Sequence, residues 1–382
     1  MRPGVALLRL TLTGFRNYAA LTWRPEGRVA VFYGPNGSGK TNLLEAVSLL
    51  VPGRGLRGAR LGDLARRGGS AWAVAGRFAT PQGEADIGTG TPPDGPAERR
   101  VFRLDGAAPR SQAEIAARVS AIWLTPQMDR LFQEGAAGRR RFLDRLVYAL
   151  EPGHAREVAA HDTAMAQRNR LLAEGGADAA WLAGIEDAMA RHAVAATAAR
   201  AALVQRLNAA LRAGVAGAFP AAELSLSCPV AERMAGGPAL AVEDWLRAAL
   251  AAGRVTDARA GSAALGSHRA DMGLADAASG LAAARASTGQ QKALLIGVVL
   301  GHAALLAEAR GAAPLLLLDE PAVHLDPGRR LELFDALRAL PAQVFLTGTD
   351  REIFFPLRGV AEALRTGGDA LLRDPDFPPA AG

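Results

Sequence analysis

The stretch "GPNGSGKT", Gly34 to Thr41, decides the fold of this chain, because it matches the pattern G-x-x-x-x-G-K-[ST] at every position. The apolar run "VAVFY" precedes it, as expected of a buried strand that ends in a glycine loop. After the loop, Leu43, Leu44 and Val47 recur at helical spacing. Strand, glycine loop and helix form one unit of an α/β fold, so we expect an α/β protein with a phosphate-binding loop.

The residues of this loop have the chemistry of a nucleotide site. Glycines permit backbone angles that turn several N–H groups inward, and the N-terminus of the following helix adds its dipole. A lysine in this place contacts the β- and γ-phosphates, and the next hydroxyl is a ligand of Mg²⁺. We therefore predict that ATP and Mg²⁺ are the cofactors and that ATP is bound by Asn36, Gly37, Gly39, Lys40 and Thr41. The alternative is a chance glycine turn.

A second stretch, "PLLLLDE", is typical of a buried strand that ends in two carboxylates. Asp319 lies where a carboxylate that holds Mg²⁺ is expected, and Glu320 is suited to polarise the attacking water. The predicted catalytic residues are thus Lys40, Asp319 and Glu320. The alternative is a structural strand that happens to end in acids, which the presence of the phosphate loop disfavours.

The spacing of the two stretches indicates a divided domain. Roughly 280 residues separate Lys40 from Asp319, more than twice the length that a compact phosphate-loop domain needs. Between them, two alanine-rich segments that start at His154 and Ala180 predict long helices folded back on each other, the second reaching Phe219. We expect an N-terminal lobe at 1–138, a mainly helical arm at 139–264 and a C-terminal lobe at 265–382.

Such an interrupted head resembles the ABC-type P-loop ATPase heads of chromosome and repair proteins, among them SMC, RecF and the nuclease-partnered ATPase of double-strand-break repair. In ABC ATPases a second phosphate-binding turn, L-S-G-G-Q, faces the ATP of a partner subunit. "ASTGQ" occupies that place in degenerate form. The resemblance implies that Ser287, Gly289 and Gln290 contact the γ-phosphate held by another copy of the chain, in a twofold homodimer that encloses two ATPs. The alternative is a plain helix cap at Ser287.

Within this class the chain resembles the RecF family over nearly its whole length. The similar motifs, in the order of that family, are "LTGFRNY", "GPNGSGKTNLLEA", "RRRFLDRL", "QRNRLL", "GSHRADM", "ASTGQQK" and "LLLLDEPAVHLD". The resemblance implies a cytoplasmic, weak, DNA-stimulated and Mg²⁺-dependent ATPase of recombinational repair and replication restart. Its ATP-driven dimer would clamp duplex DNA at single-strand gaps and help RecO and RecR to load recombinase, and hydrolysis would reset it.

Three positions depart from these patterns or match them loosely. The family often has G-P-H-R where Gly266 to Arg269 reads G-S-H-R. Thr349 stands where transporter-type ATPases carry a switch histidine, which leaves the sensing of the γ-phosphate there in question. Gln127, in "WLTPQMDRL", stands where a Q-loop glutamine would contact ATP and Mg²⁺ and couple the ATP site to the helical lobe.

The charge of the chain favours a polyanionic partner. The net charge is +6 and the pI about 10.3. Lys40 and Lys292 are the only lysines, and the remaining basic residues, apart from histidines, are arginines. Aromatic residues make up 5%, so contacts to the duplex backbone are favoured over base stacking. The arginines predicted to meet DNA follow the first helix, with a second group at the start of the arm: Arg54, Arg57, Arg60, and Arg139, Arg140, Arg141. The alternative is a solvated arginine-rich face.

Other features bound the prediction further. A single cysteine excludes an internal disulfide framework and a cysteine-based zinc site, in agreement with a cytoplasmic location. The apolar run Ala293 to Ala307 predicts a buried helix, too short to span a bilayer, and no signal peptide or membrane partner is expected. We expect Leu8, Leu10 and Leu12 on one face of the first strand, and His154 and His161 in solvent.

Two other functional classes stay open. A transporter-type motor domain is disfavoured by the long separation between the phosphate loop and "ASTGQ". A nuclease-linked ATPase head, of the double-strand-break repair or overcoming-lysogenisation type, is disfavoured because the sequence shows no further cluster of metal-binding residues.

Overall fold

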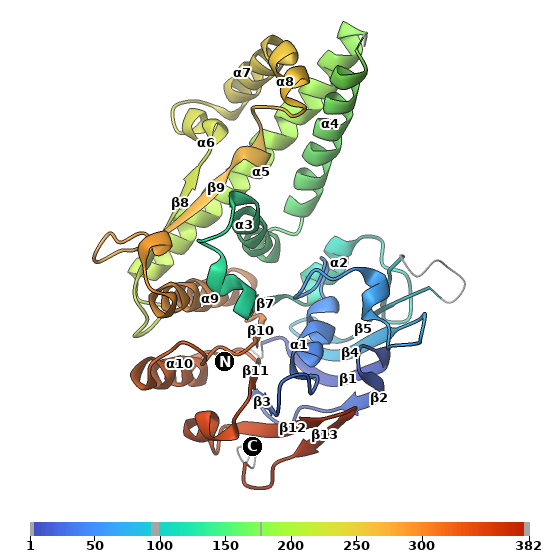
Figure 1. Ribbon diagram of the computed structural model, residues 1–382, viewed down its shortest axis with the longest axis vertical. Helices are drawn as coiled ribbons and strands as arrows, with labels where there is room; N and C mark the ends of the chain where they lie inside the picture. The colour runs from blue at the N-terminus through green and yellow to red at the C-terminus, as the bar shows by residue number, and fades with distance from the viewer. Residues whose placement is uncertain (1–3, 93–98, 176–177, 378–382) are drawn as a thin grey trace. The chain divides into compact units, whose positions relative to one another are not determined.

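The computed structural model describes residues 4–92, 99–175 and 178–377, which divide into two units (Figure 1). The first unit comprises Met1–Arg130, Gly214–Ala221 and Ser287–Gly382, and the second comprises Leu131–Ala213 and Ala222–Ala286. The chain therefore leaves the first unit and returns to it, as the spacing of "GPNGSGKT" and "PLLLLDE" predicts.

A six-stranded sheet forms the centre of the first unit, in the order β13-β12-β3-β11-β10-β7. All neighbouring strands are parallel except β12 and β13, which are antiparallel. Strands β7, β10 and β11 are buried at every residue, which explains their continuous apolar sequences. The bounds are β3 (Val29–Tyr33), β7 (Ala121–Leu124), β10 (Leu315–Leu318), β11 (Val344–Gly348), β12 (Ala361–Gly367) and β13 (Ala370–Arg373).

A five-stranded antiparallel sheet lies beside it, in the order β2-β1-β4-β5-β6. Helix α1 (Lys40–Leu49) contacts β1 and β4 of this sheet and β10 and β11 of the other, so both sheets share one apolar core (Figure 1). The bounds are β1 (Ala6–Phe15), β2 (Tyr18–Trp23), β4 (Ala73–Thr80), β5 (Gly83–Gly90) and β6 (Val101–Leu104).

The expected alternation in β1 is wrong at its start. Leu10 and Leu12 are fully buried, but Leu8 is 37% exposed and Leu7 takes its place in the core. The register between β1 and β4 shifts between Leu7 and Arg9, and such a bulge reverses the faces of the residues before it.

Helix α9 (Thr288–Arg310) is a core helix of the first unit, longer than the apolar run that predicted it. By length and composition alone its 23 residues are enough to cross a membrane, but 78% of its most apolar window is buried inside the protein. The unit also contains α2 (Gln112–Arg118), α10 (Pro327–Ala339) and the 3₁₀ helices η1 (Leu61–Leu64), η2 (Pro126–Arg130) and η5 (Arg351–Leu357).

The second unit is mainly helical, and its two long helices, α4 (His154–Glu174) and α5 (Ala179–Arg212), pack along each other as predicted. The segment between α4 and α5 lies partly outside the described residues. Helix α5 ends at Arg212, earlier than expected, before glycines 214 and 217 with positive φ. The other elements are α3 (Ala136–Leu150), β8 (Ala222–Ser227), α6 (Pro229–Met234), α7 (Ala239–Ala252), α8 (Arg254–Ala260), η3 (Ser267–Arg269), β9 (Asp271–Asp276) and η4 (Ala283–Arg285).

The second unit extends beyond the arm expected at 139–264. It starts at Leu131 and includes residues up to Ala286, while Gly214–Ala221 belongs to the first unit. The cause is strand pairing: β9, which the sequence placed in the C-terminal lobe, pairs with β8 along its whole length. The motif "GSHRADM" is therefore part of the helical unit.

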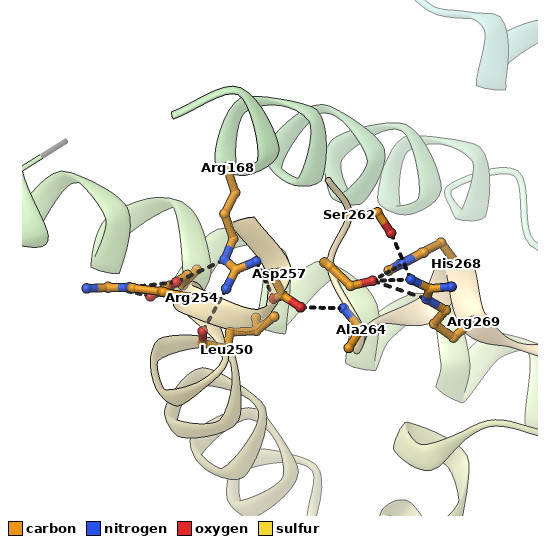
Figure 2. A network of polar contacts seen from close by, with 10 residues as sticks. Arg168, Leu250, Arg254, Asp257, Ser262, Ala264, His268 and Arg269 are labelled. Carbon is orange, nitrogen blue, oxygen red and sulfur yellow. Dashed lines mark hydrogen bonds and ion pairs between the residues drawn. The ribbon is translucent and has the colours of Figure 1, made fainter. Parts of the chain in front are cut away.

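A network of buried charges joins the helices of the second unit (Figure 2). Arg168 of α4 is fully buried; it donates to Glu186 at 2.9 Å, to Asp257 at 2.7 Å and to the carbonyl of Leu250 at 2.7 Å. Arg254 completes the network with an ion pair of 2.6 Å to Glu186. These hydrogen bonds give Arg168, the first arginine of "QRNRLL", a structural role.

The expectation that His154 and His161 are solvated is wrong. His154 is 3% exposed and its Nε2 lies 2.8 Å from Asp144, while His161 is fully buried. The His161 ring stacks on His268 of "GSHRADM", with ring centroids 5.4 Å apart. Sequence reasoning missed this because α4 is enclosed by segments far away in the chain.

Candidate nucleotide-binding site

The phosphate loop connects the end of β3 to the start of α1, at the carboxyl edge of the parallel strands, where such sheets bind their ligands. Its three glycines have φ values of 148° at Gly34, 81° at Gly37 and 99° at Gly39, all in the region that side chains disfavour. A Cβ at Gly39 would lie 2.6 Å from the side chain of Asn17, whereas one at Gly37 would meet nothing within 4 Å. The loop is thus packed against Asn17 at Gly39 and has open space at Gly37.

Lys40 is buried at this loop, and its ammonium donates hydrogen bonds to backbone carbonyls. Its Nζ donates to the carbonyl of Gly34 at 2.6 Å and to that of Pro35 at 3.0 Å, and the residue is 4% exposed. Burial lowers the pKa of Lys40, while the nearby Glu320 and Asp319 act in the opposite direction. A buried ammonium held by neutral carbonyls is suited to receive an anion.

Asp319 lies directly beside the loop and contacts Thr41, which is also a predicted ligand of Mg²⁺. Its Oδ1 accepts from the hydroxyl of Thr41 at 2.9 Å and from the hydroxyl of Thr347 at 2.7 Å, and the residue is 4% exposed. A hydroxyl and a carboxylate in contact are the oxygen ligands that Mg²⁺ prefers, so these residues fit the ion.

Glu320 has an unusual backbone conformation, with φ of 50° in the left-handed region. Its N–H donates to the hydroxyl of Thr347 at 2.8 Å, and its carbonyl accepts from Lys292 at 3.1 Å. Lys292, on α9, is 1% exposed and also pairs with Asp129 at 3.4 Å. Sequence reasoning missed Lys292 and Thr347, although Lys292 is one of only two lysines in an arginine-rich chain.

Gln127 lies in η2, directly after β7, and its side chain is exposed. Strand β7 pairs with β10 through Leu124 and Leu318, so η2 starts next to the strand that leads to Asp319. Two residues further on, Asp129 makes the ion pair with Lys292. The expected contact of Gln127 with ATP and Mg²⁺ stays a prediction.

Ser287 is the N-cap of α9 and forms a capping box with Gln290. Its hydroxyl accepts from the N–H of Gln290 at 3.3 Å, and the Gln290 side chain accepts from the N–H of Ser287 at 2.9 Å. A Cβ at Gly289 would lie 2.9 Å from the carbonyl of His324, which explains the glycine sterically. The cap and a contact to a partner's ATP are compatible, because Ser287 and Gln290 are exposed; that contact stays a prediction.

The predicted DNA-contacting arginines after α1 are all exposed: Arg54, Arg57 and Arg60. Arg57 is tied down by Asn42 at 2.8 Å and Glu45 at 3.4 Å. Arg100 holds the segment that carries these arginines, because it donates to the carbonyls of Leu49 and Gly53. The sequence did not indicate this role of Arg100. Burial lowers the pKa of Arg100 to about 10.

The arginines at the start of the arm are placed differently. Arg139 pairs with Asp271 at 2.7 Å, and Arg140 donates to the carbonyl of Ala270 at 2.9 Å, within the second unit. Arg141 is exposed. Of the three, Arg141 is the one with a side chain presented to solvent for a phosphate.

Comparisons with known proteins agree with this geometry. Residues 6–356 match the family model described as the RecF/RecN/SMC N terminal domain. The DNA replication and repair protein RecF of Mesorhizobium japonicum is 48% identical over 359 residues, covering 93% of this chain and 94% of that protein. The chain belongs to the RecF family. RecF of Agrobacterium fabrum is also 48% identical, over 94% of this chain and 96% of its own.

Solved structures agree with the expected fold, an ABC-type ATPase head. The recombination mediator protein RecF–ATPγS of the RecFOR pathway matches with a TM-score of 0.85 over 97% of this chain and 99% of its own, at 21% identity. The Smc head domain of Pyrococcus furiosus matches with a TM-score of 0.54 over 97% of this chain and 96% of its own, at 15% identity. The prediction of an ABC-type head, divided as in the RecF family, is confirmed.

Proposed function

We propose that this protein is a Mg²⁺-dependent, DNA-stimulated ATPase that acts in DNA replication and repair. The observation that carries the proposal is the position of Lys40: a buried ammonium bound to two carbonyls, in an open glycine loop, next to the contact between Thr41 and Asp319. The family supports the cellular role, since relatives 48% identical are named DNA replication and repair proteins.

Each residue has a distinct task in the proposed reaction. The N–H groups of the loop and Lys40 bind the β- and γ-phosphates, with Asn36, Gly37 and Gly39 in the same loop. Thr41 and Asp319 would hold Mg²⁺, with Gln127 as a further ligand, and the bound ion would supply positive charge next to the phosphates. Glu320 orients the water that attacks the γ-phosphate.

The proposed ATPase works as a homodimer. Ser287, Gly289 and Gln290 of one copy contact the ATP of the other, so ATP binding closes the dimer and hydrolysis opens it. The exposed N-terminus of α9 supports this, because its first N–H groups and its dipole are suited to a phosphate. The ATP and ATPγS bound by related RecF proteins are in agreement.

The proposed DNA partner is duplex DNA at a single-strand gap or junction, bound through the backbone by Arg54, Arg57 and Arg60. The net charge of +6 supports a polyanion, and phosphate contacts would make the affinity fall with salt. At such gaps the dimer helps RecO and RecR to load recombinase in the cytoplasm. The named pathway of the RecFOR relative supports this assignment.

The test is steady-state ATP hydrolysis at increasing protein concentration, with and without gapped duplex DNA. We expect a specific rate that rises with concentration, because the site is shared, and rises again with duplex. A rate independent of both would reject the dimer and the DNA role. The alternative of a nuclease-linked head predicts Mg²⁺-dependent DNA cutting by the pure chain, which the same samples would reveal on a gel.

A further inference from the structure

In the proposed function, the carboxylates of Glu320 and its neighbour Asp319 both have to point toward the nucleotide. In an extended strand, successive side chains point to opposite faces, so two adjacent carboxylates would diverge. Here Glu320 leaves the extended conformation with φ of 50°. Asp319 contacts Thr41 of the phosphate loop at 2.9 Å, and the charges of both carboxylates oppose the lowering of the Lys40 pKa by burial.

Two side chains from other elements hold the backbone of Glu320 on both sides. On one side, the Thr347 hydroxyl of β11 accepts from the Glu320 N–H at 2.8 Å. On the other, the Lys292 ammonium of α9 donates to the Glu320 carbonyl at 3.1 Å. Both are buried, Thr347 at 0% and Lys292 at 1% exposed, so water does not compete for these hydrogen bonds.

Each of the two anchors is itself fixed. The hydroxyl of Thr347 also donates to Asp319 at 2.7 Å, and the ammonium of Lys292 pairs with Asp129 of η2 at 3.4 Å. A backbone in a sparsely populated conformation persists only where its surroundings hold it, and such positions gather at active sites. The anchors supply that hold at Glu320.

We propose that Lys292 and Thr347 are positioning residues of the ATPase reaction: they hold the Glu320 peptide in its left-handed conformation and thereby aim its carboxylate at the attacking water. Neither touches the water or the phosphates in this role. The inference rests on the proposed function, in which Glu320 orients that water. It also gives a reason for lysine at position 292, in a chain whose only other lysine is Lys40, since the compact ammonium reaches one carbonyl where a planar guanidinium would need more room.

The first experiment compares Lys292→Met and Thr347→Val with the wild-type protein. We expect kcat to fall roughly 10- to 100-fold in each, because small misplacement of a catalytic group has effects of this size. KM for ATP and the Kd for ATPγS should stay within about twofold, since the phosphate contacts are untouched. The matched control is Thr347→Ser, which keeps the hydroxyl and should keep most of the activity.

A purely structural role would give a different pattern. If Lys292→Met and Thr347→Val weakened ATPγS binding and lowered the unfolding temperature in parallel with kcat, the positioning role would be overturned. The same holds if Thr347→Ser were as inactive as Thr347→Val. If Lys292→Met fails to fold, Lys292→Arg provides a second variant that keeps a buried positive charge. Full activity of Lys292→Arg, together with a loss of activity in Thr347→Val, would overturn the positioning role of Lys292 but not that of Thr347.

The decisive experiment combines each variant with Glu320→Gln. If the anchors act through Glu320, Lys292→Met should lower kcat little or not at all in the Glu320→Gln protein, because residues that act as a unit are non-additive. An equal loss in both backgrounds would overturn the proposal. The single variant Glu320→Gln separates the proposed function from this inference. Full activity of Glu320→Gln would reject Glu320 as the residue that orients the water. Loss of activity in Glu320→Gln, with Lys292→Met and Thr347→Val fully active, would reject only the positioning role.

Discussion

Two buried cations, Arg168 in the second unit and Lys40 in the first, have partners of different kinds. In the second unit, Arg168 is enclosed by two carboxylates and a carbonyl, so its charge is balanced within the protein. In the first unit, Lys40 is held by two carbonyls that carry no net charge. A buried ion with complete partners makes the arrangement of helices specific, whereas one with incomplete partners is suited to bind a ligand. The partners of a buried charge, more than its burial, indicate which role it has.

The largest expected effect comes from removing the Lys40 ammonium, which forms no ion pair within 4 Å among the described residues. Lys40→Met should lower ATP hydrolysis on the order of 10³-fold, because a preorganised donor to the phosphates is lost. The free energy of unfolding should stay nearly the same, since the hydrogen bonds that Lys40 donates go to neutral carbonyls and not to carboxylates. Hydrolysis rates and urea unfolding of the same preparation check both statements; a strongly destabilised variant would contradict the comparison.

The second prediction concerns the shared site. Ser287→Arg should leave ATP binding nearly normal but abolish dimerisation and hydrolysis, because the longer cation would lie where the partner's γ-phosphate is expected. Binding of ATPγS, sedimentation with ATP and the hydrolysis rate test this. Ser287→Ala serves as a control for the helix cap, whose loss costs about 1 kcal/mol. Intact hydrolysis in Ser287→Arg would refute the dimer model.

Arg168→Met should have the opposite effect to Lys40→Met: it should lower stability and leave nucleotide binding intact. It leaves Glu186 and Asp257 buried with fewer partners, so we expect the free energy of unfolding to fall by about 3–5 kcal/mol. Binding of ATPγS should be retained at temperatures where the protein stays folded, because the nucleotide site belongs to the other unit. Denaturant unfolding and nucleotide titration are the measurements, and loss of nucleotide binding in a stable Arg168→Met protein would break the distinction between the units.

The stacked histidines predict a dependence of stability on pH. Burial lowers the pKa of His268 from 6.5 to about 4, so the unfolded chain binds a proton that the folded one does not between these values. Stability should therefore fall, on the order of 1–2 kcal/mol, as the pH decreases from about 6.5 toward 4. Unfolding across this range, with His268→Gln as the control that removes the titration, tests it. A slope that is unchanged in His268→Gln would assign the dependence to other groups.

The smallest effect is expected at the exposed arginines. Arg54→Ala and Arg60→Ala should each weaken duplex binding by less than about 1 kcal/mol and reduce the salt dependence by about one unit, because each removes one phosphate contact. Arg57→Ala should have a smaller effect on DNA, since Arg57 is already bound to Asn42 and Glu45. Titrations at several salt concentrations measure these slopes.

Much of the nucleotide site could be predicted from short patterns. The phosphate loop and the strand "LLLLDE" determine their local structure, and the parallel sheet brings their ends together. The contact of Thr41 with Asp319 follows from that topology. Lys292 and Thr347 could not be predicted, because they act on the backbone of Glu320 from elements that meet only in the folded sheet.

The sequence by itself determined the class of the fold, the glycine loop between β3 and α1 and the division of the chain, because these depend on local backbone chemistry and on spacing. Only the tertiary structure decided where the units begin and end, which histidines are buried and which arginines remain exposed. Those outcomes depend on which distant segments cover a residue, as β9 joins β8 and as segments around α4 enclose His161. Burial and charge balance are properties of such neighbours, and no single stretch of sequence contains them.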